Sequence, residues 1–131
     1  MMLKDSKSFS GLSVDDLQKA EHFYSTTLGL EVTKEHNTID LLRLHLAGGG
    51  TVMIYPRANH VPADYTVLNF PVTDIEATVK KLKDKGVKFE NYDSEDLKTD
   101  KNNIARGNGP TNAWFTDPAG NILAIIELAR A

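Results

Sequence analysis

Hydrophobic and polar positions follow the same order twice along the chain, and each series predicts one strand, one helix and three further strands. In the first series the helix begins at Asp15 or Asp16, because a carboxylate there accepts hydrogen bonds from the unpaired amides of the first turn. The apolar residues of 17–28 fall within one stripe of a helical wheel, and Gly29 ends the helix by adopting positive φ. The strands of this series are expected at 8–14, 30–36, 39–46 and 51–55, with a turn at 48–50.

The second series begins after a polar connector at 56–64 and repeats the order of the first. A shift of 58 positions places Asp16 on Asp74 at the helix start, and a shift of 57 places Gly29 on Gly86 at the helix end. This agreement favours a duplicated βαβββ unit over two unrelated amphipathic helices. One such unit cannot cover both faces of its own sheet, so we expect the two to pack together. The strands of the second series are expected at 65–70, 87–92, 111–116 and 121–128.

The chain is therefore predicted to have an α+β fold. We expect a single domain over 1–131, with one module at about 7–56 and the other at about 65–128.

A tight hairpin is predicted near the end of the second module. The residues Asp117-Pro118-Ala119-Gly120 have the composition of a type I turn followed by a left-handed glycine, which closes a three-residue loop. If Asp117 pairs with Asn121, Trp114 lies opposite Ala124 on the same face of the sheet.

An 18-residue connection at 93–110 precedes this hairpin. It exceeds the roughly 12–15 residues usual for a loop without structure of its own. A lid over a binding site and a merely mobile surface segment are both compatible with its composition.

Composition and charge exclude several classes of protein. The 131 residues suffice for one domain that buries roughly two-thirds of its surface. A net charge of −3 disfavours nucleic-acid binding, and no apolar run approaches the roughly 18 residues that cross a bilayer. The first residues lack the apolar core of a signal peptide, and the absence of cysteine excludes thiolate metal sites. We expect a cytoplasmic protein that binds neither nucleic acid nor membrane.

Two motifs carry a family resemblance. The segment 14–30, with Phe23-Tyr24 and Leu28-Gly29-Leu30, and the segment 115–121 around the hairpin turn resemble the vicinal oxygen chelate superfamily. That superfamily includes glyoxalase I, extradiol dioxygenases, fosfomycin resistance enzymes and bleomycin resistance proteins. The resemblance spans about residues 7–128. It implies two βαβββ modules whose strands curl into a cup, often completed as a homodimer.

The resemblance also implies metal ligands at four inward strand positions. The four positions are found by counting from the capping residues Asp16 and Asp74, from Asp117 of the turn, and along the strand after Gly50. The side chains at these positions have no lone pair to offer a cation. They are Phe9, Ile54, Val67 and Ala124. The four histidines show no ligand spacing, and Glu127 lies an odd number of positions beyond Ala124, hence on the opposite face. We expect no metal and no cofactor.

With apolar side chains at the metal-ligand positions, the cup is expected to bind a small organic molecule instead of a metal ion. Trp114 beside the small Ala124 is a candidate stacking platform, and Asn69 offers an amide. The alternation of 42–46 places its leucines against the helix and its polar side chains inside the cup. The candidate ligand-binding residues are Phe9, Arg43, His45, Ile54, Val67, Asn69, Trp114 and Ala124. The competing interpretation is that the apolar ones only fill the core.

Three functions remain compatible with these residues. The first is a metal-independent small-molecule binding protein of the bleomycin resistance type, working as a homodimer. The second is a lyase or isomerase without the usual divalent metal, with His45, Arg43 or Tyr55 handling the proton. The third is a partner-binding module with a filled cup.

Overall fold

The chain divides into two compact units. The computed structural model describes residues 2–36, 38–107 and 109–128. One unit spans Met1–His60 and the other Val61–Ala131, so each predicted module falls inside one unit. The predicted outer limits of the domain, residues 1 and 131, lie outside the described residues.

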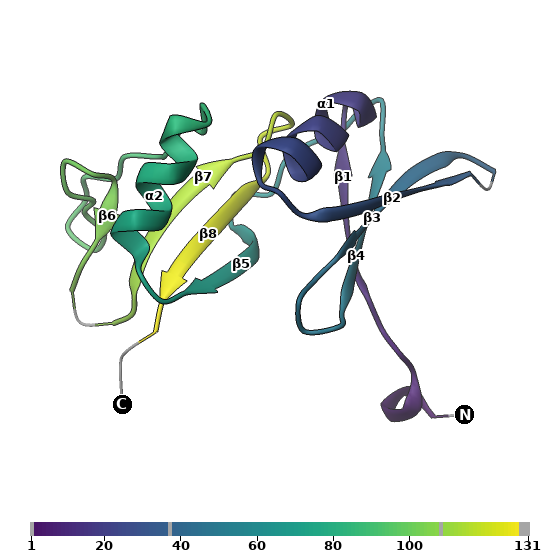
Figure 1. Cartoon of the computed structure of the whole chain (residues 1–131), viewed down its shortest axis with the longest axis horizontal. Coiled ribbons are helices and arrows are strands. Elements are labelled where there is room, and N and C mark those ends of the chain that lie inside the picture. The colour runs from purple at the N-terminus through teal and green to yellow at the C-terminus, as the bar shows by residue number, and fades with distance from the viewer. Residues whose placement is uncertain (1, 37, 108, 129–131) are drawn as a thin grey trace. The chain divides into compact units, whose positions relative to one another are not determined.

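The N-terminal unit is a mixed four-stranded sheet with a helix against one face (Figure 1). The strand order is β1-β4-β3-β2, with β1 parallel to β4 and the other neighbours antiparallel. A 3-10 helix precedes the sheet at Leu3–Asp5. The elements are β1 (Ser10–Val14), α1 (Leu17–Glu21), a π-helix (His22–Thr27), β2 (Glu31–His36), β3 (Asp40–His45) and β4 (Thr51–Pro56).

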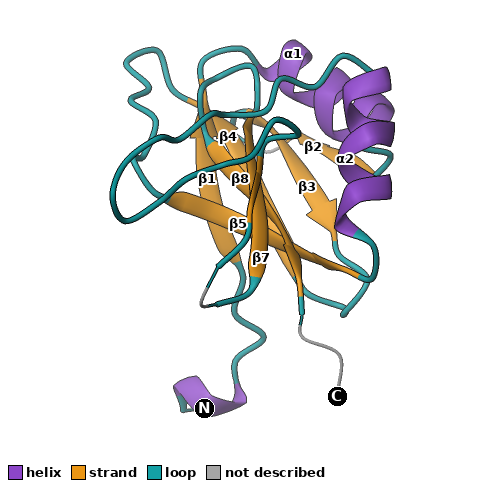
Figure 2. Cartoon of the chain, turned by 90° about the vertical axis from the view of Figure 1, so that its left-hand side faces the viewer, coloured by secondary structure: helices purple, strands orange, loops and turns teal. Residues whose placement is uncertain are grey.

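The C-terminal unit repeats this topology. Its strand order is β5-β8-β7-β6, with β5 parallel to β8, and α2 lies against β7 and β8 (Figure 2). The elements are β5 (Thr66–Val72), α2 (Ile75–Asp84), β6 (Ile104–Ala105), β7 (Thr111–Thr116) and β8 (Ile122–Glu127). The α+β class and the duplicated βαβββ order are confirmed.

The predicted caps explain why the two helices begin and end alike. The Asp16 carboxylate accepts from the Lys19 amide at 3.0 Å, and the Asp74 carboxylate accepts from the Ala77 amide at 3.1 Å. Gly29 and Gly86 follow the helices with φ of 74° and 91°, a region that glycine enters without strain. No helix among the described residues is long and apolar enough to cross a membrane.

The first helix departs from the single α-helix that was predicted. After Glu21 it widens into the π-helix, so the Leu28 amide donates to the carbonyl five residues earlier, that of Phe23. Phe23 and Tyr24 are buried there, with ring centroids 5.3 Å apart and perpendicular planes.

Each sheet has one face covered by its helix, and the opposite face is here called the open face. In the N-terminal sheet, Leu42 and Leu44 are at most 1% exposed and lie on the helix-covered face, as predicted. In the C-terminal sheet, Ala113, Phe115 and Leu123 are at most 1% exposed on the equivalent face.

The predicted strand at 87–92 is wrong as a full strand. Only Phe89 forms a bridge, with Phe115, while β6, inside the predicted connection, pairs with Ala113 and Asn112. The outer edge of β7 is thus shared between two short segments, because neither is long enough to pair along all of it.

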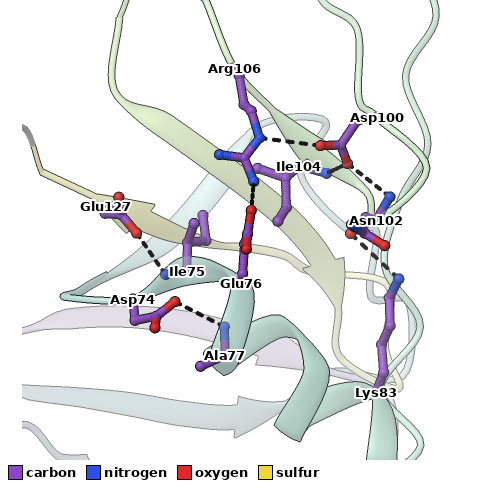
Figure 3. A network of polar contacts seen from close by, with 10 residues as sticks. All are labelled: Asp74, Ile75, Glu76, Ala77, Lys83, Asp100, Asn102, Ile104, Arg106 and Glu127. Atoms are coloured by element: carbon purple, nitrogen blue, oxygen red, sulfur yellow. Dashed lines mark hydrogen bonds and ion pairs between the residues drawn. The ribbon is translucent and has the colours of Figure 1, made fainter.

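The connection at 93–110 is also more ordered than a loop without structure. Asp93 bridges Lys98, and the Asp100 carboxylate accepts from the amides of Asn102 and Ile104 (Figure 3). Arg106 joins this carboxylate to Glu76 on α2. Burial raises the pKa of Asp100, but these hydrogen bonds and the Arg106 charge outweigh it and hold the pKa below its ordinary value.

Candidate ligand-binding site

A row of three predicted residues crosses the open face of the C-terminal sheet. Asn69 on β5 pairs with Ala124 on β8, and Ala124 pairs with Trp114 on β7. Directly paired residues point to the same face, so the three side chains lie side by side. The predicted pairing of Trp114 with Ala124 is confirmed. Glu127 lies on the opposite face, where its carboxylate accepts from the Ile75 amide at 2.7 Å (Figure 3).

The members of this row differ in exposure. Ala124 is 1% exposed, whereas Trp114 is half-buried and Asn69 is exposed. A ligand on this face therefore meets the indole ring and the amide, while the Ala124 methyl group is already covered.

Tyr92, which was not among the predicted ligand-binding residues, adds a second aromatic ring to this face. Its ring centroid lies 5.4 Å from that of Trp114, with the planes at 89°. Burial raises the pKa of Tyr92, and the nearby Glu90 carboxylate adds to this rise, so the phenol stays protonated. The perpendicular rings form a corner in which a flat molecule can stack on one ring and meet the other with its edge.

Val67 does not follow the alternation used to place it. The register shifts between Thr66 and Leu68, so Val67 has no Cα partner on β8. The prediction that Val67 and Asn69 point to the same face assumed regular alternation, which this bulge interrupts. The sequence offers no proline or glycine that would have indicated it.

The open face of the N-terminal sheet holds Arg43 in a network of its own. The Arg43 guanidinium lies 4.8 Å from the centre of the Phe9 ring, which is 53% exposed. Nε and Nη2 of Arg43 donate to the two oxygens of Glu35 at 2.5 and 3.3 Å, and Nη1 donates to Thr51 at 3.3 Å. Glu35 was not among the predicted residues, because its pairing with Arg43 depends on the register between β2 and β3.

His45 and Tyr55 lie on the same open face as Arg43. On β4, Thr51, Met53 and Tyr55 alternate with buried residues and therefore share this face, and Thr51 and Met53 pair with His45 and Arg43 on β3. The His45 Nε2 is 2.9 Å from the hydroxyl oxygen of Thr33.

Ile54 requires a correction. It is 0% exposed and pairs with Leu42 on the helix-covered face. Its β4 neighbours Met53 and Tyr55 face the open side instead, so the count along this strand was displaced by one residue. The one-residue shift moves the side chain to the other face of the sheet.

Arg43 lowers the pKa of the Glu35 carboxyl. The hydrogen bond and the charge of Arg43, opposed by burial, hold the pKa of the Glu35 carboxyl below its ordinary value near 4.5. We expect Arg43→Met to raise this pKa toward 4.5, as measured by NMR titration of the Glu35 carboxyl carbon. Because the folded-state pKa is depressed, the pair stabilises the fold above the unfolded-state pKa. That contribution is lost as the pH falls through the folded-state value.

Lys34→Met is the matched control for this titration, because Lys34 pairs with Glu21, 3.3 Å away, and not with Glu35. An unchanged Glu35 pKa in Arg43→Met contradicts the assignment.

Two surface hollows lie away from the predicted residues. One, of about 340 Å³, lies between α2 and the segment at 102–104 and includes Val79, Lys83 and Ile104. The other, of about 210 Å³, lies beside α1 and includes Leu17 and Asp40. Both are lined by a mixture of charged and apolar residues, and neither contains a member of the row on the open face.

A family model described as the Glyoxalase/Bleomycin resistance protein/Dioxygenase superfamily matches residues 8–125. The chain belongs to this superfamily. Among curated proteins, none matches it.

Three solved structures share the fold. TnmS3, an antibiotic binding protein from Streptomyces sp. CB03234, is 18% identical with a TM-score of 0.74 over 98% of this chain and 100% of that chain. A glyoxalase family protein from Enterococcus faecalis is 24% identical with a TM-score of 0.69 over 97% and 100%. A superfamily member from Sphaerobacter thermophilus is 22% identical with a TM-score of 0.66 over 92% and 96%. At these identities the likeness shows the fold alone.

The donor chemistry expected of a metal-dependent superfamily member is not found at the four positions where the resemblance places it. Phe9, Val67 and Ala124 have hydrocarbon side chains, and so does Ile54, although Ile54 faces the helix and its neighbours on the open face are Met53 and Tyr55. Across residues 2–36, 38–107 and 109–128, no three His, Asp or Glu side chains form a group that could hold a metal ion.

Proposed function

We propose that this superfamily member binds a small, flat organic molecule on the open face of its C-terminal sheet, without a divalent metal. The observation that carries the proposal is the perpendicular pair of Trp114 and Tyr92 next to the exposed amide of Asn69. Aromatic walls with a few polar groups are typical of sites for small organic ligands.

Metal independence rests on side-chain chemistry. Hydrocarbon side chains at Phe9, Val67 and Ala124 leave three of the four implied ligand positions without a donor atom, and a divalent cation needs several convergent N or O donors. TnmS3, which shares this fold, is an antibiotic binding protein, and this likeness supports small-molecule binding by the present chain. The predicted homodimer, the cytoplasmic location and the enzyme and partner-binding alternatives stay predictions.

The site can be tested with the chain's own reporter. Trp114 is the single tryptophan of the chain, so its emission reports on ligand contact directly. Titration with acridine, a planar and uncharged probe at mildly alkaline pH, is expected to quench this emission to saturation. Calorimetry is expected to show that Trp114→Ala weakens acridine binding by about tenfold, because one base-sized stacking contact contributes about 1–3 kcal/mol.

Tyr65→Ala is the matched control. Tyr65 is 66% exposed and precedes β5, outside the row, so its removal is expected to leave acridine binding unchanged. Equal loss in both variants, or no saturable quenching of the native protein, overturns the proposal.

Metal independence has its own measurement. Protein dialysed against EDTA is expected to bind acridine as before, and added zinc or manganese is expected to leave the affinity unchanged. Binding that disappears on dialysis and returns with the metal contradicts the metal-free part of the proposal.

A further inference from the structure

We propose that the ligand of this site is an organic cation, recognised by Glu90 together with Trp114 and Tyr92. The inference rests on the proposed function and deepens it, since it assigns the charge of the molecule that the aromatic corner takes. It concerns only the C-terminal unit.

The geometry places Glu90 at the end of the row. Phe89 bridges Phe115 in antiparallel fashion, and their rings lie 5.4 Å apart on the helix-covered side. The next residue, Glu90, then lies opposite Trp114, and its amide donates to the Trp114 carbonyl at 2.8 Å. Because side chains alternate along an extended segment, Glu90 points to the open face beside the indole ring.

The surroundings leave this carboxylate as a charge without a basic neighbour on the sheet. The strands β5, β6, β7 and β8 contain no lysine or arginine, and their one charged residue, Glu127, faces the helix. Lys88, two positions before Glu90 and by the same alternation on the same side, is exposed and forms no ion pair with Glu90 in the described chain. Glu90 is half-buried, so water screens its field less than at a fully exposed position.

The two rings favour the same charge. The faces of indole and phenol carry negative electrostatic potential, which attracts cations such as ammonium or N-alkylated ring nitrogen. Glu90 lies opposite Trp114, and the Trp114 ring contacts that of Tyr92, so the carboxylate and the two rings lie close together. A flat cation gains stacking, cation–π attraction and a carboxylate partner there, whereas an anion meets repulsion from Glu90.

The experiment compares three probes of one shape: 10-methylacridinium, acridine and acridine-9-carboxylate. With the full chain at mildly alkaline pH and low salt, the cation is expected to bind about fivefold tighter than acridine, and the anion weaker than acridine. Rising ionic strength is expected to reduce the preference for the cation, because salt screens the charge.

Glu90→Gln keeps the shape of the side chain and removes its charge. No hydrogen bond of the Glu90 side chain appears in the described chain, and the pairing with β7 uses the backbone, so the variant is expected to fold. It is expected to lose the roughly fivefold preference while keeping its affinity for acridine. Glu95→Gln makes the same charge change at an exposed position of the 94–97 turn and is expected to keep the preference.

The outcomes separate the two proposals. If acridine binds the native protein and the cation binds no tighter, the cation inference fails while the proposed function stands. If Glu90→Gln keeps the full preference, Glu90 is not the recognising group and the inference also fails. If none of the three probes binds, both proposals are overturned.

Discussion

Replacing Phe115 by alanine is expected to lower the free energy of unfolding by about 4 kcal/mol. Phe115 is 1% exposed near the end of β7, on the sheet face that α2 covers, and its ring centroid lies 5.4 Å from that of Phe89. Its removal leaves a cavity that the surrounding β-sheet can fill only in part, because β7 is paired on both edges. The measurement is urea denaturation followed by Trp114 emission, since this reporter is the adjacent residue.

Phe9→Ala is the matched control for the same change of side chain. Phe9 is 53% exposed, and its loss is expected to change the free energy of unfolding by less than about 0.5 kcal/mol. A cost below about 1 kcal/mol for Phe115→Ala contradicts the central place of this ring in the C-terminal core.

The second large effect is expected at the hairpin between β7 and β8. Asp117 is 4% exposed, and its carboxylate accepts from the amides of Ala119 and Asn121 and from the Asn121 side chain, each at 2.9 Å. Asp117→Ala leaves these donors without this acceptor in a buried turn, which is expected to cost about 3 kcal/mol in the free energy of unfolding. Asp117→Asn keeps one acceptor oxygen and is expected to cost less.

Asp96→Ala serves as the control for the hairpin variant, because Asp96 is exposed. It is expected to unfold at the same urea concentration as the native chain. If the Asp117→Ala and Asp96→Ala variants unfold at the same urea concentration, the result contradicts a stabilising role for the turn carboxylate.

Features decided within a few residues were predicted well. Asp16 and Asp74 cap their helices, and Gly29 and Gly86 end them, because a cap hydrogen bond and a positive φ depend on local geometry. Trp114 meets Ala124 because the turn beginning at Asp117 sets the register of the strands that it joins.

Features that depend on partners far along the chain were predicted poorly. Ile54 was placed by counting, and a displacement of one residue put it on the wrong face. Val67 falls at a bulge, where alternation does not hold. The Glu35 partner of Arg43 depends on which strands pair and in which register, so spacing in the sequence does not reveal it.

The site shows the same division. Trp114, Ala124 and Asn69 come from regular strands, so their shared face follows from strand alternation and hairpin register. Glu90 and Tyr92 come from a segment with a single bridge to β7, for which the sequence predicted a longer strand.

The sequence by itself determined the duplicated order of elements, the helix ends, the hairpin register and the hydrocarbon character of three of the four implied metal positions. All of these follow from the chemistry of single residues and their near neighbours. Only the tertiary structure decided which segments share the outer edge of β7 and which charge stands beside the indole ring. The physical reason is that distant segments pair only where loop closure and side-chain packing together allow it, and neither is encoded in local periodicity.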